Sequence, residues 1–201
     1  MKTEVAKALF NSHSYQEYRK LISDLLLEGK STGSEQSEDL THYSELNDTR
    51  MNRLDKTIAI TEDNIQKIKD LKGEYIWLVI SEGWCGDAAQ ILPIINKMAI
   101  ESDNIELKIV LRDENVDLMK LFLTNNKKSI PVVIVIDKET GGDIAKWGPR
   151  PQAATDLISD YIKQFGSIDE TVKTNLQLWY LQNKGISTQD ELVSIMLSLD
   201  K

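Results

Sequence analysis

The 201-residue sequence contains a single cysteine, Cys85, so no disulfide can form within the chain. An unpaired thiol is typical of a reducing compartment, and we therefore expect a cytoplasmic protein. No apolar run approaches the roughly 20 residues that a membrane span needs, and the first residues lack the apolar core of a signal peptide. The sequence thus excludes a scaffold held by internal disulfides and predicts neither a membrane span nor a secretion signal.

Histidine is equally scarce, because His13 and His42 are the only two. With one cysteine and no carboxylates at ligand spacing, we expect no metal site. No phosphate-binding glycine loop or dinucleotide fingerprint occurs, so we expect no nucleotide cofactor. The net charge of -8 also disfavours nucleic acid and anionic membranes as partners.

The first 55 residues or so have the pattern of helices. Ser14-Tyr15-Gln16-Glu17 is a capping-box sequence, and apolar residues then recur at helical spacing up to Gly29. A second helix is predicted by a single stripe formed by Leu40, Tyr43, Asn47, Met51 and Leu54. Its opposite side carries charges that include Arg50 and Arg53, and we interpret this side as a solvated face.

From about residue 56, strand and helix patterns alternate. Apolar runs predict five strands, at residues 57–60, 75–81, 105–111, 131–136 and 144–147. Amphipathic segments predict helices after Thr61 and after Cys85, and at residues 116–123 and 152–165. This order indicates the α/β class, with a central mixed sheet that helices flank on both faces.

Two further helices are predicted at the carboxy-terminal end, where Ser167 and Thr188 begin capping signatures. We therefore expect three parts: a helical extension at residues 1–55, an α/β domain at 56–165, and a helical extension at 166–201. Isolated helices of this length are marginal in water. The extensions are accordingly expected to pack on the α/β domain.

The sequence Trp84-Cys85-Gly86-Asp87 joins the apolar run at residues 75–80 to the helix that follows. A thiol at such a turn lies at the positive end of the helix dipole, which favours the thiolate over the thiol. A lone cysteine is otherwise most often a small buried apolar residue. The turn context makes Cys85 the leading candidate for a reactive nucleophile.

Several motifs together resemble the thioredoxin superfamily, and in particular bacterial thioredoxin family proteins of poorly defined function. They are Trp84-Cys85-Gly86, Pro93 eight residues after the cysteine, Ile130-Pro131 before an apolar strand, and Gly148 after the next strand. The resemblance covers roughly residues 56 to 165 and implies a thioredoxin-like fold. It implies that Cys85 matches the attacking cysteine and that Pro131 matches the family's cis-proline. The backbone of Ile130 would then pair with a bound extended peptide, in a groove bordered by Trp84, Gly86 and Gly148.

The departures from the family's pattern concern the groups that complete its chemistry. Ala88 stands where thioredoxins have their resolving cysteine, and Asp87 stands where they have a proline. Val79 replaces their buried acid, and Ile109 replaces its lysine partner. A dithiol enzyme needs a second thiolate and a proton carrier. Ordinary thioredoxin reductant activity is therefore not expected.

Three charged residues are candidates for supporting Cys85. Asp87 is either a catalytic group for proton transfer or simply an acid at a helix start, where its charge meets the dipole. Arg112 follows a central strand and would supply positive charge to the site, or would pair with Asp113 in solvent. Arg150 near Gly148 would contact an anionic peptide or thiol, or would be a solvated loop residue.

Two functions fit this sequence. The first is a monothiol thioredoxin-like protein in cytoplasmic thiol-disulfide exchange or redox homeostasis, in which Cys85 forms a mixed disulfide; it would be an oxidoreductase that lacks the resolving cysteine. Its partner would be a protein or small-molecule disulfide, with a low-molecular-weight thiol as co-substrate and no other cofactor. The second is a non-catalytic thioredoxin-fold module that binds a protein or peptide. We expect a monomer or weak dimer; a disulfide between two copies of Cys85 is a third reading.

Overall fold

A four-stranded mixed sheet forms the centre of the protein in the computed structural model, which describes residues 1–200. The strands lie in the order β2-β1-β3-β4, namely β2 (Ile105–Leu111), β1 (Tyr75–Ser81), β3 (Val132–Asp137) and β4 (Asp143–Trp147). β1 runs parallel to β2 and antiparallel to β3, which forms a hairpin with β4. The predicted mixed sheet and hairpin are confirmed.

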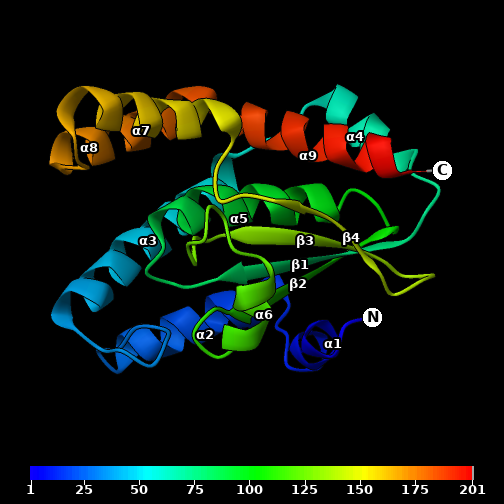
Figure 1. Ribbon diagram of the computed structural model, residues 1–201, viewed down its shortest axis with the longest axis horizontal. Coiled ribbons are helices and arrows are strands. Elements are labelled where there is room, and N and C mark those ends of the chain that lie inside the picture. Colours follow the sequence, from blue (N-terminus) through cyan, green and yellow to red (C-terminus); the bar gives the residue numbers. More distant parts are fainter. Residues whose placement is uncertain (201) are drawn as a thin grey trace.

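Helices cover both faces of this sheet (Figure 1). One face carries α1 (Thr3–Phe10), α2 (Tyr15–Leu27) and α6 (Val116–Leu121), and the other carries α5 (Gly86–Ala99). An outer layer above α5 is formed by α4 (Glu62–Lys69), α7 (Gln152–Phe165), α8 (Glu170–Asn183) and α9 (Ile186–Leu199). α3 (Glu38–Thr57) packs on both α2 and α5, so it links the two sides. No helix within residues 1–200 is long and apolar enough to cross a membrane.

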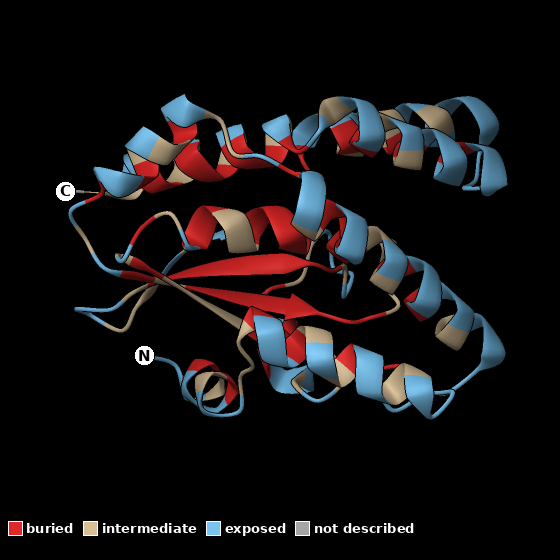
Figure 2. Ribbon diagram, turned by 180° about the vertical axis from the view of Figure 1, so that it is seen from behind, coloured by how far each residue is buried: buried red, intermediate tan, exposed pale blue. Residues whose placement is uncertain are grey.

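Burial explains why the central strands are continuous apolar runs rather than alternating ones. In β1 and β3 almost every side chain is buried, because helices lie above and below them (Figure 2). The largest fully buried side chain in β1 is that of Trp77, whose indole nitrogen donates to the sulfur of Met196 in α9. The carboxylate of Asp200 binds the backbone amides of Lys72 and Gly73. The carboxy-terminal helix is therefore tied to the first residues of β1. The division of the chain at residues 55 and 165 stays a prediction.

The predicted strand at residues 57–60 does not form. α3 continues to Thr57, and residues 58–61 are extended without a partner strand. Two of their backbone groups bind a side chain instead: Gln189 accepts from the amide of Thr61 and donates to the carbonyl of Ala59. The outer edge of β2 is instead paired at one position, where the backbones of His13 and Ile109 exchange two hydrogen bonds. Residues 57–60 therefore form no strand: Gln189 binds part of their backbone, and His13 already occupies the edge of β2 beside Ile109.

Local capping signals were correct at the amino-terminal side and misplaced at the carboxy-terminal side. Ser14 and Glu17 form the predicted capping box, and Thr61 caps α4. α8 is capped by Asp169 rather than Ser167, because the Asp169 carboxylate accepts two amide hydrogen bonds. α9 begins at Ile186, directly after Gly185 at a φ of +78°, so Thr188 lies inside this helix and is buried. Tertiary packing decided which of several capping residues was used.

Candidate functional site

Cys85 lies at the end of β1 and is the N-cap residue of α5. Its sulfur accepts a hydrogen bond from the amide of Ala88 at 3.5 Å, as expected at the amino-terminal end of a helix. Its thiol donates to the carbonyl oxygen of Ile130 at 3.4 Å. The cysteine therefore contacts the chain before β3, where the sequence placed the substrate-binding backbone.

Some of the residues expected to border a groove lie together here, although Ile130 and Pro131 are buried, and Trp84 and Gly86 instead line a separate cavity formed with α3 and α8. The bond between Ile130 and Pro131 is cis, as predicted. Gly148 lies against Pro131 and has a φ of +118°; an added Cβ would lie only 2.3 Å from the Pro131 carbonyl oxygen. Only glycine can hold this position without moving the backbone of its neighbour.

The thiol of Cys85 is neutral in this arrangement, contrary to the expectation of a thiolate. The residue is only 8% exposed. Burial, followed by the negative charge of Asp87, raises the pKa of the thiol to about 12, although hydrogen bonds from the backbone and the charge of Arg150 act in the other direction. The position at the helix end is as predicted, but removal from water outweighs the favourable dipole.

Asp87 and Arg150 form a partly buried network with a residue that sequence reasoning missed. The Asp87 carboxylate accepts from Arg150 Nε at 2.7 Å and from the Tyr180 hydroxyl at 2.9 Å. Tyr180 belongs to α8 and is buried over the start of α5. Both carboxylate oxygens are thus engaged away from the cysteine, which fits a helix-start acid better than a proton carrier. Arg150 is half-buried and paired with Asp87, so it is not simply a solvated loop residue, and its contact with an anionic peptide or thiol stays a prediction.

Arg112 does not reach the thiol. Its guanidinium lies over the ring of Trp84, 4.7 Å from the centroid, and its Nε donates to Asp113 at 2.8 Å. The pairing with Asp113 was the alternative reading of this residue. Arg112 therefore holds the Trp84 side chain by a cation–π contact rather than supplying charge to Cys85.

The turn before Cys85 is held by residues of the amino-terminal region. Thr32 Oγ1 accepts from the amide of Gly83 at 2.8 Å, and Asn47 Nδ2 donates to the Gly83 carbonyl at 3.0 Å. Both side chains are buried. The signal for Asn47 was visible in the sequence, because it is a polar residue in the middle of an apolar helical stripe.

We expect Asn47→Ala to lower the free energy of unfolding by about 2 kcal/mol, because it leaves the buried Gly83 carbonyl without a donor. The measurement is urea denaturation followed by circular dichroism. Glu45→Ala, on the exposed side of the same helix, is the control and should change stability by less than about 0.5 kcal/mol. An equal effect of the two changes would contradict the proposed role of Asn47 in holding the turn.

Glu82, three residues before the cysteine, is a buried acid that the sequence analysis did not single out. From the sequence, only the presence of Val79 at the position of the buried acid of thioredoxins was noted. It is fully buried, and burial is the main reason that its pKa is raised. Its Oε1 accepts from the amide of Asp113 at 2.9 Å, while Oε2 has no hydrogen-bond partner among residues 1–200. Glu82 thus connects the turn before Cys85 to the loop after β2.

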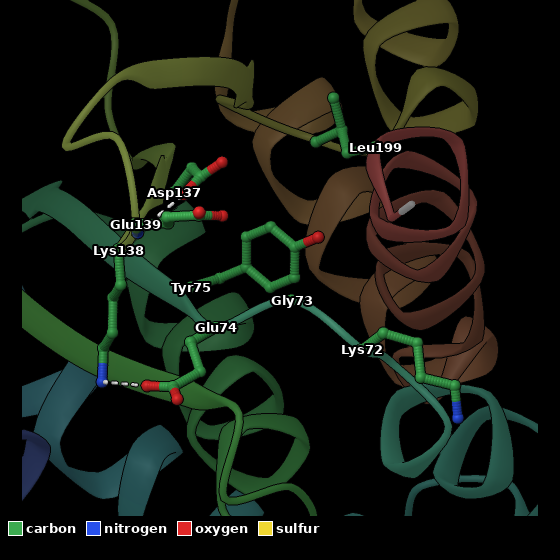
Figure 3. A pocket seen from close by; sticks show the side chains of 8 residues that line it. All are labelled: Lys72, Gly73, Glu74, Tyr75, Asp137, Lys138, Glu139 and Leu199. Carbon is green, nitrogen blue, oxygen red and sulfur yellow. Dashed lines mark hydrogen bonds and ion pairs between the residues drawn. The ribbon is translucent and has the colours of Figure 1, made fainter.

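A cavity of about 540 Å³ lies at the opposite end of the sheet, where Tyr75 begins β1 (Figure 3). Among its charged residues, Lys138 pairs with Glu74 and with Glu106. Asp137 accepts from the backbone amide of Glu139. The described part of the chain also contains no cluster of three potential metal ligands.

Comparisons with known proteins agree with this fold. The sequence matches the family model described as thioredoxin over residues 33–164, more than half of the chain. A crystal structure of an HIV epitope-scaffold is similar with a TM-score of 0.58 and 19% identity, covering 94% of this chain and 100% of that chain. A protein of unknown function from Pseudomonas aeruginosa is similar with a TM-score of 0.52 and 16% identity, covering 92% and 98%. At these identities the two structures show a shared fold alone, and no curated protein matches the sequence. With its mixed sheet, its cysteine at the start of α5 and this family match, the chain belongs to the thioredoxin family.

Proposed function

We propose that the protein carries out monothiol thiol-disulfide exchange through Cys85. In the first step the sulfur of Cys85 attacks a disulfide, forms a mixed disulfide, and releases one thiol, which takes up the proton that Cys85 loses. Because Ala88 occupies the position of a resolving cysteine, an external thiol completes the cycle. It attacks the mixed disulfide, leaves as the new disulfide, and returns the proton to Cys85.

The observation that carries this proposal is the hydrogen bond from the Cys85 thiol to the carbonyl of Ile130. A hydrogen bond donated by the neutral thiol disfavours its ionisation. An extended substrate that pairs with the backbone of Ile130 would offer its own amide to the same carbonyl. Substrate pairing would therefore release the thiol next to the incoming disulfide, so that the cysteine is protected at rest and becomes available on binding.

The second candidate function is a non-catalytic binding module, and the burial of Cys85 favours it. In this case the groove at Ile130 and Pro131 would bind a protein or peptide, and the cysteine would serve only as a small buried residue. The two functions share the groove and differ in the fate of the sulfur. An experiment that measures the reactivity of Cys85, rather than peptide binding, therefore distinguishes the two functions.

We expect the folded protein to form a mixed disulfide with excess glutathione disulfide at pH 8, detected as one added glutathionyl group by mass spectrometry of the intact protein. Excess reduced glutathione should remove the group. Cys85→Ser, which has no thiol, should show no addition. Formation of the adduct only in denaturant, with none in the folded protein over the same time, would leave the binding module as the function.

The expected partners of the exchange are protein or small-molecule disulfides, and the proposed location is the cytoplasm, where an unpaired cysteine stays reduced. The protein is proposed to work as a monomer or weak dimer. Size-exclusion chromatography with and without reductant addresses the third reading, since a dimer linked through Cys85 would dissociate only when reduced.

A further inference from the structure

A second cavity, of about 530 Å³, lies between α3, α8 and the start of α5. Its volume is within the range of roughly 300–1,000 Å³ that is usual for small-molecule sites. Apolar and aromatic side chains make up much of its wall: Leu40, Tyr43, Leu46, Trp84 and Leu176. Residues on either side of Cys85 also line it, but Cys85 itself does not. The cavity is therefore distinct from the space occupied by the thiol.

Arg50 is the group that gives this cavity its chemical character. The other guanidinium groups removed from water each pair with a carboxylate: Arg19 with Asp48 and Asp55, Arg112 with Asp113, and Arg150 with Asp87. Arg50 is partly buried, yet within residues 1–200 it forms no ion pair and donates only to the neutral amide of Asn47 at 2.8 Å. Burial lowers its pKa, as does the neighbouring Arg53. Glu45 and Arg53 on the predicted solvated face are exposed as expected, whereas Arg50 is only partly exposed.

The remaining charges in the wall are already balanced. Asp87 is held by Arg150 and Tyr180, and Lys173 pairs with Glu170 at 2.6 Å. One positive charge is left, on a planar group that binds carboxylates through parallel hydrogen bonds. A phosphate, with nearly two negative charges, would lack a second free cation and would face the two acids. The balance favours a ligand with a single carboxylate.

We propose that this cavity binds a small organic molecule with one carboxylate and an apolar body. The carboxylate pairs with Arg50 and the body contacts Trp84 and Tyr43. Gly86 places the start of α5 close to the Arg50 guanidinium, because an added Cβ there would lie in van der Waals contact with it, at 3.9 Å. This site goes beyond the exchange reaction of Cys85 and does not depend on it.

The test is a titration of the full-length, ¹⁵N-labelled protein with hippurate, which carries a carboxylate on an amide-linked phenyl ring. Binding is followed at the indole N–H of Trp84 by NMR. We expect saturable binding that is at least about tenfold tighter than that of the neutral hippuramide. Inorganic phosphate at the same concentration should not displace hippurate. Displacement by phosphate, or equal affinity for hippurate and its amide, would overturn the proposal.

Two variants assign the preference to Arg50. Arg50→Gln should abolish the difference between hippurate and hippuramide, whereas Arg53→Gln, on an exposed residue of the same helix that does not line the cavity, should keep it within about twofold. Equal losses in both variants would refute a specific contact. Cys85→Ser should bind hippurate as the wild type does, so a failure of the exchange reaction and a failure of this site give different results.

Discussion

Gly148→Ala is expected to lower the free energy of unfolding by about 4 kcal/mol, by adding backbone strain to a steric clash. The φ of Gly148 is +118°, which residues with a side chain rarely adopt, and the new Cβ would lie 2.3 Å from the carbonyl oxygen of Pro131. A carbonyl of the main chain cannot turn aside as a flexible side chain can. Urea denaturation measures the loss, which would be a large fraction of the 5–15 kcal/mol that is typical for a whole protein.

Gly29→Ala is the matched control. Gly29 also has a positive φ, of +69°, but nothing lies within 4 Å of an added Cβ. The cost there should be about 1 kcal/mol, from backbone conformation alone. If the two variants lose equal stability, the contact between Gly148 and Pro131 has no energetic role. The same contact predicts that Gly148→Ala forms the mixed disulfide more slowly, because the chain beside the Cys85 thiol must shift.

Asp87→Asn is expected to lower the pKa of Cys85 and to make the thiol more reactive. The sign follows from the charges around the sulfur: Asp87 raises the pKa of Cys85, second only to burial, and Arg150 lowers it. Removing the carboxylate charge leaves that of Arg150 unbalanced, which favours the thiolate further. A fall of about one pH unit would give a tenfold larger thiolate fraction at pH 8. Because nucleophilicity falls with pKa, the rate constant for alkylation should rise about threefold.

Alkylation by iodoacetamide, measured from pH 7 to 9, checks this expectation. Asp113→Asn removes the same charge from another ion pair, with Arg112, and should leave the rate within about twofold of the wild type. A slower reaction of Asp87→Asn, with circular dichroism showing a folded protein, would indicate that Asp87 accepts a proton from Cys85 after all. That result would restore the catalytic role that the sequence suggested for this residue.

Features governed by neighbouring residues were predictable from the sequence. The capping box at Ser14, the apolar strand 75–81 and the helix start at Cys85 each depend on a few adjacent side chains. The arrangement of Cys85, Ile130 and Pro131 was also predictable, through the family resemblance. The predicted strand at residues 57–60 failed because an apolar run shows β propensity but not whether a partner strand is free.

The sequence by itself determined the α/β class, the order of the main elements and the position of the single sulfur at a helix start, since these follow from local patterns. Only the tertiary structure decided the state of that sulfur. Burial of Cys85 and the charge of Asp87 outweigh the helix dipole, and this balance depends on groups distant in the chain. Tyr180 and Asn47 reach the site from α8 and α3, and Arg50 is partly buried in a cavity whose wall α3 and α8 form together. The removal of water by distant helices is a property of packing, which no local pattern contains.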